Sequence, residues 1–282
     1  MYNMTRKFVL FVGQLYVLIA VFQQAVLGHW KVNGTQVNKL RWKYKQEVLK
    51  LMSQAISPSP AISMYGIIYF CWGTTIFSVS NNGTLLWSHQ ITADMSSGIV
   101  ESSPVVSLDN TVYVAAGKSL YSLKYDKGDI SSWYFQTDGA IKGSPLITHD
   151  GTIYVSSLDM NIYAISADTH KLKWSYTTQG GIVSTPAIDK EGSIYVTSLD
   201  NLLYKLSNQG RLMWTFNATG KLYASPVVAA SELSMFKQVY EDDDVVFVVS
   251  GEPVYKLYAV SSHTGRELWV WIIFKNSRYL LH

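Results

Sequence analysis

The chain has 282 residues, of which 48% are hydrophobic and 15% are charged, so it can bury a large core and is not composed like a disordered protein. The formal net charge of +3 includes Arg6 and Lys7. Once the stretch 1–28 is set aside, 23 − 2 = 21 basic side chains face 20 acidic ones, and this nearly neutral body offers no long-range attraction to DNA or RNA. We therefore expect no nucleic-acid partner.

The N-terminus is typical of a secretory signal peptide. Arg6 and Lys7 precede an apolar run at residues 8–22, and Val26 and Gly28 are suitably placed for cleavage after residue 28. We expect a signal peptide at residues 1–28 and a protein of the secretory pathway that is extracellular or associated with the plasma membrane. The apolar run is short for a membrane span, but an uncleaved anchor remains the alternative.

Three Asn-X-Thr triplets follow the signal peptide and predict N-glycosylation. The candidate acceptors are Asn33, Asn82 and Asn217. Cys71 is the only cysteine, so no internal disulfide can form and stability must come from packing. Because Cys71 lies in the apolar run IIYFCW, we expect it to be a small buried hydrophobic residue.

Residues 29–57 form a predicted N-terminal segment that contains one strand. In NKLRWKYK, residues 38–45, Leu40, Trp42 and Tyr44 alternate with four basic residues, which is the period of a strand with one apolar face. Lysines on the other face suit an exposed edge. We expect an outer strand that no inner strands precede, with a basic membrane-contacting stretch as the alternative.

From residue 58 to residue 273 the sequence repeats itself at a nearly constant interval. Ser-Pro or Thr-Pro pairs end at Pro60, Pro104, Pro145, Pro186 and Pro226, so that the numbers of successive prolines differ by 44, 41, 41 and 40. Each pair opens a short apolar run, which a tight polar turn, two further strands and a fourth strand follow. Four short strands in every ~40 residues predict an all-β protein, a β-propeller with about five recognisable blades.

Each repeat carries a tryptophan in its fourth strand, and the N-terminal strand carries another. These residues are Trp42, Trp87, Trp133, Trp174, Trp214 and Trp269. A large ring that recurs once per blade suits packing against the next blade, so we predict that these tryptophans are structural docking residues. Stacking on a ligand is the alternative.

The turns before the tryptophans discriminate among propeller repeats. The runs SADTHKLKW, residues 166–174, and SSHTGRELW, residues 261–269, resemble the tryptophan-docking motif A-x-D-x-x-T-G-x-x-x-W of the pyrroloquinoline-quinone-like repeat family. The resemblance covers residues 58–273. It implies a propeller that commonly has seven or eight blades, similar to the non-enzymatic bacterial outer-membrane assembly lipoprotein.

Five repeats are fewer than that family commonly has. We expect either a shortened form, with an incomplete ring and a short off-pattern tail at residues 274–282, or a closed five-bladed ring. The last repeat also contains an insertion with an acidic run at residues 241–244. We expect a solvated loop there, with calcium binding as a minor alternative.

The sequence contains no pattern that indicates catalysis. Dehydrogenases of the resembling family bind their quinone with calcium, an aspartate base and often a vicinal cysteine pair, which Cys71 alone cannot supply. The six histidines lie far apart and lack metal-site spacing. Asp159 and Asp200 occupy equivalent positions in successive repeats, which favours a turn-stabilising role over a catalytic pair. We expect no catalytic residue, no metal and no cofactor.

Three functions remain. The favoured one is a cofactor-free scaffold that binds a protein partner, because propeller loops stand on a rigid frame. The alternatives are a quinone-dependent oxidoreductase and a glycan-binding propeller. The scaffold interpretation rests mainly on the resemblance.

Overall fold

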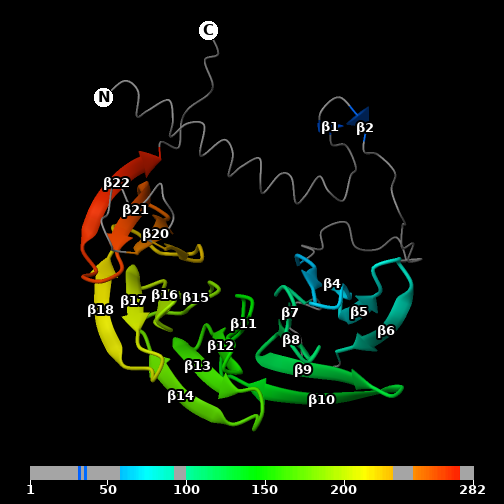
Figure 1. Ribbon diagram of the computed structural model, residues 1–282. Helices are drawn as coiled ribbons and strands as arrows, with labels where there is room; N and C mark the ends of the chain where they lie inside the picture. Colours follow the sequence, from blue (N-terminus) through cyan, green and yellow to red (C-terminus); the bar gives the residue numbers. More distant parts are fainter. Residues whose placement is uncertain (1–30, 33–34, 37–57, 92–99, 231–243, 274–282) are drawn as a thin grey trace. The chain divides into compact units, whose positions relative to one another are not determined.

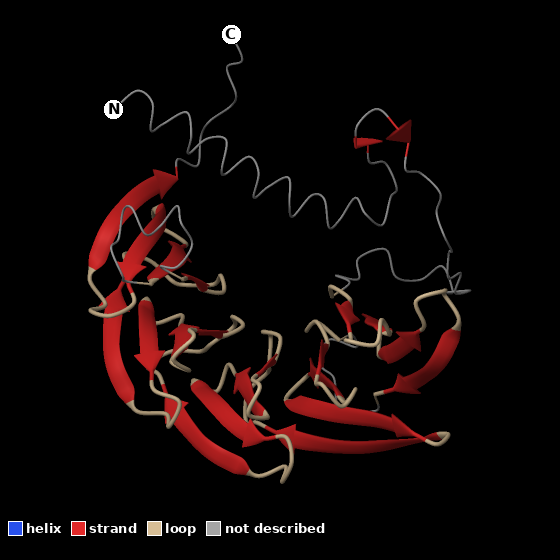
Figure 2. Ribbon diagram, viewed as in Figure 1, coloured by secondary structure: helices blue, strands red, loops and turns tan. Residues whose placement is uncertain are grey.

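Regular structure is entirely β in the parts of the chain that the structure describes. This computed structural model describes residues 31–32, 35–36, 58–91, 100–230 and 244–273. Within these ranges strands alternate with turns (Figure 2), and no helix there is long and apolar enough to cross a membrane. The predicted signal peptide, Asn33, the strand of Trp42, the acidic run up to residue 243 and the tail lie outside the described residues.

The chain divides into two units. The smaller unit, residues 1–48 with 82–84, contains a two-stranded antiparallel sheet of β1 (Lys31–Val32) and β2 (Thr35–Gln36). The larger unit, residues 49–81 and 85–282, contains five four-stranded sheets, which we call blades 1 to 5 in chain order (Figure 1).

Every blade pairs its four strands antiparallel in chain order. Blade 1 consists of β3 (Ala61–Ile62), β4 (Ile68–Trp72), β5 (Thr75–Val79) and β6 (Leu85–Gln90). Blade 2 consists of β7 (Val105–Val106), β8 (Val112–Ala116), β9 (Ser119–Asp126) and β10 (Asp129–Gln136). Blade 3 consists of β11 (Leu146–Ile147), β12 (Thr152–Ser156), β13 (Asn161–Ser166) and β14 (Leu172–Thr177). Blade 4 consists of β15 (Ala187–Ile188), β16 (Ile194–Thr197), β17 (Leu202–Leu206) and β18 (Leu212–Asn217). Blade 5 consists of β19 (Val227–Ala229), β20 (Val245–Ser250), β21 (Tyr255–Ser261) and β22 (Glu267–Ile273).

The Ser-Pro and Thr-Pro pairs connect neighbouring blades beside their short first strands. The backbone N–H of Ser103 donates to Oγ of Ser144 at 2.9 Å, and the N–H of Ser144 donates to Oγ1 of Thr185 at 2.9 Å. The same bond runs from Ser59 to Ser103 and from Thr185 to Ser225, each at 3.0 Å. We call this row of bonds the hydroxyl belt. It explains why a hydroxyl residue, and not any residue, precedes the proline of each repeat.

Tight turns set the register between the first and second strands of each blade. Gly151 and Gly192 take positive φ values of 71° and 85° in these turns, a conformation that glycine adopts without a Cβ penalty. The carboxylate of Asp150 accepts the N–H of Thr152 at 3.2 Å and so closes the turn that Gly151 continues. The polar pairs seen in the sequence therefore act through their backbone preferences and short side-chain bonds.

The core lies between neighbouring blades. All residues of β8 and β12 are buried, whereas the fourth strands are mostly exposed and only some of their positions are buried or partly buried. Each of the four core clusters combines two successive blades; for example, Tyr154 and Ile162 of blade 3 pack with Tyr204 and Leu206 of blade 4. Stability therefore depends on the four joints between blades, which burial of apolar area holds together.

Candidate functional site

Trp174 shows how one blade docks against the next. Its indole Nε1 donates to the backbone oxygen of Asn208 at 3.0 Å, in the turn between β17 and β18. Its ring lies so close to Gly210 that a Cβ built there would be 2.5 Å from a ring carbon. Gly210 also has a positive φ of 79°. The turn therefore requires glycine twice, for its backbone conformation and for the space that the ring occupies.

Trp214 repeats this arrangement at the joint of blades 4 and 5. Its Nε1 donates to the backbone oxygen of Ser262 at 3.0 Å, and a Cβ at Gly265 would lie 2.7 Å from the ring. The two joints thus use the same bond and the same close approach. The docking role of the tryptophans as a set stays a prediction, and it is testable at these glycines.

Gly210→Ala is expected to lower the free energy of unfolding by about 1–3 kcal/mol more than Gly192→Ala does. This difference is the usual cost of forcing a methyl group into a packed joint. Gly192 is a matched control because its φ is also strongly positive, whereas its Cβ would meet only the Cβ of Asn208, at 3.7 Å. Chemical unfolding of both variants measures the difference. Equal losses would show that the tryptophan contact does not stabilise the joint.

Trp87 and Trp133 dock in other ways. Trp87 is 8% exposed, lies beside Tyr69 and stacks on Tyr125 of the blade 2 hairpin, with ring centroids 6.4 Å apart. Trp133 stacks on the imidazole of His170 in blade 3, at 4.5 Å and nearly parallel. His170 has a φ of 57° and occupies the turn position that Gly210 and Gly265 hold in the later blades. Trp133 therefore cannot take the position that Trp174 takes, because a Cβ stands there.

Trp269 lies in the outer strand of blade 5. Its ring is 5.8 Å from Phe247 of the same blade and tilted against it. The docking role of Trp269 stays a prediction.

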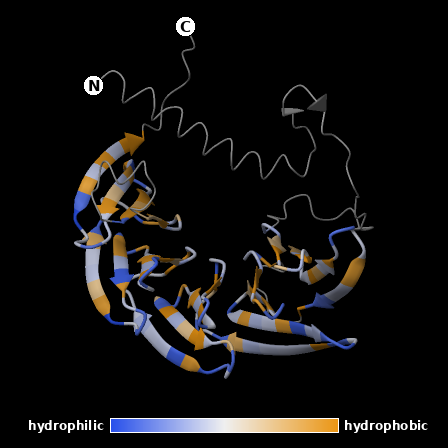
Figure 3. Ribbon diagram, in the orientation of Figure 1, coloured by the Kyte–Doolittle hydropathy of each residue, from blue (hydrophilic) through white to orange (hydrophobic). Residues whose placement is uncertain are grey.

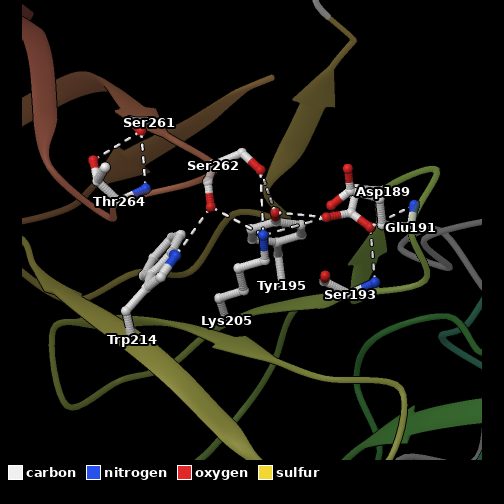
Figure 4. A network of polar contacts seen from close by, with 9 residues as sticks. All are labelled: Asp189, Glu191, Ser193, Tyr195, Lys205, Trp214, Ser261, Ser262 and Thr264. Carbon is white, nitrogen blue, oxygen red and sulfur yellow. Dashed lines mark hydrogen bonds and ion pairs between the residues drawn. The ribbon is translucent and has the colours of Figure 1, made fainter. Parts of the chain in front are cut away.

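A buried ion pair lies at the joint of blades 4 and 5 (Figure 4). The Lys205 ammonium is 3.5 Å from Oδ2 of Asp189, and their side chains are only 4% and 1% exposed. Lys205 also donates to the backbone oxygen of Ser262 at 3.0 Å, which ties blade 4 to blade 5. The hydroxyl of Tyr195 donates to Asp189 at 2.9 Å and lies 2.8 Å from Oγ of Ser262.

The network satisfies the charges that it buries. Oδ1 of Asp189 accepts two backbone N–H groups, from Glu191 at 3.0 Å and from Ser193 at 2.7 Å. Burial raises the pKa of the Tyr195 hydroxyl far above its usual value, and the negative charge of Asp189 raises it further, so this hydroxyl stays protonated and donates. A satisfied, closed network of this kind suits a structural joint better than a reaction with a substrate from solution.

A cleft of about 650 Å³ lies at the joint of blades 2 and 3, within the size range of small-molecule sites. The turn after β7, the strands β9 and β10, and two turns of blade 3 line it. The lining includes the stacked pair of Trp133 and His170 together with Asp109, Lys124 and Asp168.

The charged groups of this cleft differ in their partners. Lys124 binds Asp109 at 2.6 Å, in a pair that is about half exposed and therefore weak. Burial raises the pKa of Asp109, but hydrogen bonds from Lys124 and from the two hydroxyls beside it outweigh burial and hold the pKa well below its usual value. Asp168 is exposed, and within the described residues it forms no hydrogen bond or ion pair.

The other residues singled out in the sequence lie apart from the buried network and from the cleft. Asp159 and Asp200 sit in turns, where each accepts a backbone N–H two residues ahead and a tyrosine hydroxyl four residues ahead. Asn82 and Asn217 are exposed, so their glycosylation stays a prediction that accessibility allows. Burial raises the pKa of the Cys71 thiol to about 12, so Cys71 is not a reactive thiolate.

The ion pair and the cleft were missed in the sequence, although each left a signal. Lys205 stands in LLYKLS where the preceding repeat has alanine in NIYAIS, so a charge replaces a small residue inside a strand. His170 stands in SADTHKLKW where the docking motif has glycine. Both substitutions break the repeat at a position that faces the neighbouring blade.

Four-stranded antiparallel blades that dock through tryptophan on the turn of the next blade define a β-propeller of the pyrroloquinoline-quinone-like repeat class. The chain belongs to the family described as outer membrane protein assembly factor BamB, which matches residues 30–176 and 132–270. The predicted fold class and the resemblance are thereby confirmed.

The solved structures that are similar to this chain include an assembly factor and a dehydrogenase. BamB from Moraxella catarrhalis superposes with a TM-score of 0.60 at 17% identity, over 76% of this chain and 60% of that one. The quinohemoprotein alcohol dehydrogenase ADHIIG from Pseudomonas putida HK5 superposes with a TM-score of 0.62 at 14% identity, over 77% of this chain and 42% of that one. The chain thus spans less than two thirds of either relative, and at these identities the likeness concerns the fold alone. A search of curated proteins found no match.

Proposed function

We propose that the chain is a cofactor-free scaffold that binds a protein partner in the cell envelope or the secretory pathway, and that strand β22 of blade 5 is its binding surface. The exposed apolar character of β22 carries the proposal. Val270, Trp271, Ile272 and Ile273 are 39–49% exposed at the outer edge of the sheet, where Figure 3 shows hydrophobic residues along most of the strand. Membership of a family described as an assembly factor supports the same function.

The other outer strands show what is unusual about β22. At the position after the docking tryptophan, β14 and β18 carry Ser175 and Thr215, whereas β22 carries Val270. Exposed edge strands usually carry charges that prevent association with other chains. β22 carries one charged residue, Glu267 at its first position, and β18 carries none, so the continuous apolar run from Leu268 to Ile273 is what distinguishes β22. An apolar edge of this kind favours addition of a strand from another protein.

Two matched double variants test this surface. Leu268→Lys with Val270→Lys is expected to remove the partner that the unmodified chain recovers from its own cells after crosslinking. Met213→Lys with Thr215→Lys, at the same positions of β18, is expected to leave recovery unchanged. Melting temperatures confirm that both variants fold. Recovery of the same partner at the same yield with all three proteins would contradict the proposal.

The quinone-dependent relative raises the question of a cofactor. Among the described residues no three His, Cys, Asp or Glu side chains gather closely enough to hold a metal ion, and buried Cys71 is the single cysteine of the chain. These donors do not fit a calcium-bound quinone. We therefore expect pyrroloquinoline quinone with Ca²⁺ to leave the melting temperature unchanged; a rise that depends on quinone concentration would favour the oxidoreductase alternative.

A further inference from the structure

The positions that form the buried network at the joint of blades 4 and 5 recur around the cleft at the joint of blades 2 and 3. Lys205 pairs with Trp214 across two strands, and Ser122 pairs with Trp133 in the same way. Six positions of the buried network have a counterpart that lines the cleft. The pairs are Asp189 and Ser107, Tyr195 and Tyr113, Lys205 and Ser122, Trp214 and Trp133, Ser262 and Ala167, and Gly265 and His170. The two joints are therefore two versions of one structure.

The cleft opens because its side chains are smaller. Serine stands at position 122 where blade 4 has Lys205, and serine at position 107 where it has Asp189. The corresponding joint of blades 3 and 4 also has a small residue, Ala164, and there Trp174 packs tightly against Gly210. At the cleft His170 stands in place of that glycine, and its imidazole stacks on the indole of Trp133 at 4.5 Å. The Lys205 side chain thus has no counterpart at this joint, where Ser122 lines the cleft instead.

The cleft keeps the aromatic ring beside the ammonium of the buried network, and it carries its carboxylates at other positions, Asp109 and Asp168. In the buried network the Lys205 ammonium lies 5.3 Å from the centre of the Tyr195 ring. Tyr113 holds the position of Tyr195 in the cleft. Apart from its two histidines, the lining carries two carboxylates, Asp109 and Asp168, and one ammonium, Lys124. Lys124 pairs with Asp109, and Asp168 has no ion pair among the described residues. Burial raises the pKa of Tyr113, and the negative charges of Asp109 and Asp168 raise it further, which indicates a negative potential at its hydroxyl.

We propose that this cleft binds a primary ammonium group on an alkyl chain, in the position that Lys205 occupies at the joint of blades 4 and 5. The alkyl chain lies along Trp133, and the ammonium reaches Tyr113 and Asp168, so the aromatic rings and the carboxylate recognise it together. The ammonium belongs either to a lysine side chain of a protein or to a free diamine. The proposal does not depend on β22, so its failure would leave the proposed scaffold function standing.

Three small molecules test the chemistry with the full chain. N-acetyl-lysine methylamide represents a peptide lysine, 1,5-diaminopentane represents a free amine, and the Nε-acetylated form of the first is its neutral control. Binding is followed by the indole N–H resonance of Trp133, which a Trp133→Phe variant identifies. We expect one or both amines to shift this resonance in a saturable way and the neutral control to leave it in place. Tighter binding of the lysine amide points to a protein ligand, and tighter binding of the diamine points to a small amine.

Three variants test the position. Asp168→Asn is expected to weaken amine binding about tenfold, because it removes a charge-assisted hydrogen bond. Asp129→Asn, on the β9–β10 hairpin but outside the lining, is expected to change nothing. Ser122→Lys is expected to abolish binding by supplying a tethered ammonium, and Ser107→Asp can be added to pair it as in blade 4.

Three results would overturn the proposal: no shift of the Trp133 resonance with either amine, an equal shift with the neutral control, or unchanged binding by Asp168→Asn.

Discussion

Asp189→Ala is expected to lower the free energy of unfolding by about 3–5 kcal/mol, the usual cost of removing one partner of a buried ion pair. The change leaves the Lys205 ammonium buried without its carboxylate and takes the acceptor from the Tyr195 hydroxyl. It also removes the acceptor of two backbone N–H groups in the turn after β15. Urea unfolding followed by tryptophan fluorescence measures the loss.

A double variant separates the pair from its surroundings. Asp189→Thr with Lys205→Ala reproduces the residues of blade 3, where Thr148 and Ala164 hold the same positions. Because no charge is then left buried, we expect this variant to be clearly more stable than Asp189→Ala. A double variant as unstable as the single one would show that the buried charge of Lys205 is not the cause of the loss.

Trp87→Ala is expected to cost about 3–5 kcal/mol, the range for deleting a large buried ring from a core. Trp87 is 8% exposed and belongs to the core cluster between blades 1 and 2. Its removal leaves a cavity beside Tyr69 and takes the stacking partner from Tyr125. The loss is measured as the shift in the denaturant midpoint.

Trp133→Ala serves as the comparison for Trp87. The Trp133 ring lines an open cleft and is partly exposed, so its removal takes away less buried contact and creates less new cavity. We expect a distinctly smaller loss than for Trp87. If both substitutions cost the same, the stability of a joint would not depend on how deeply its tryptophan is buried.

The periodic parts of the fold could be predicted from the sequence because each blade repeats the same local preferences. Proline before a short strand, a polar pair such as Asp150-Gly151 in a turn and alternation in the fourth strand each act within a few residues. Their recurrence makes the number and order of strands readable. The hydroxyl belt was not predicted, because the partner of each hydroxyl lies in another blade, one whole repeat away along the chain.

The buried network and the cleft depend on which residues meet across a joint. Lys205 in a strand reads as an exposed lysine until its neighbours, Asp189 in the same blade and Ser262 in the next, are known. His170 reads as a solvent-facing turn residue until Trp133 is seen against it. Alignment of the repeats with one another would have marked both positions as departures. It would not have shown what faces them.

The hydroxyl belt bears on how such a chain can gain or lose repeats. Ser103, Ser144 and Thr185 each bring one donor, directed to the following blade, and one acceptor, directed to the preceding blade. At the two ends of the belt, Ser59 brings its donor and Ser225 its acceptor. A duplicated repeat would therefore arrive with both halves of the connection already matched to its new neighbours, and a deleted repeat would leave two matching halves to join. The number of blades can change in this architecture without any compensating substitution along the belt.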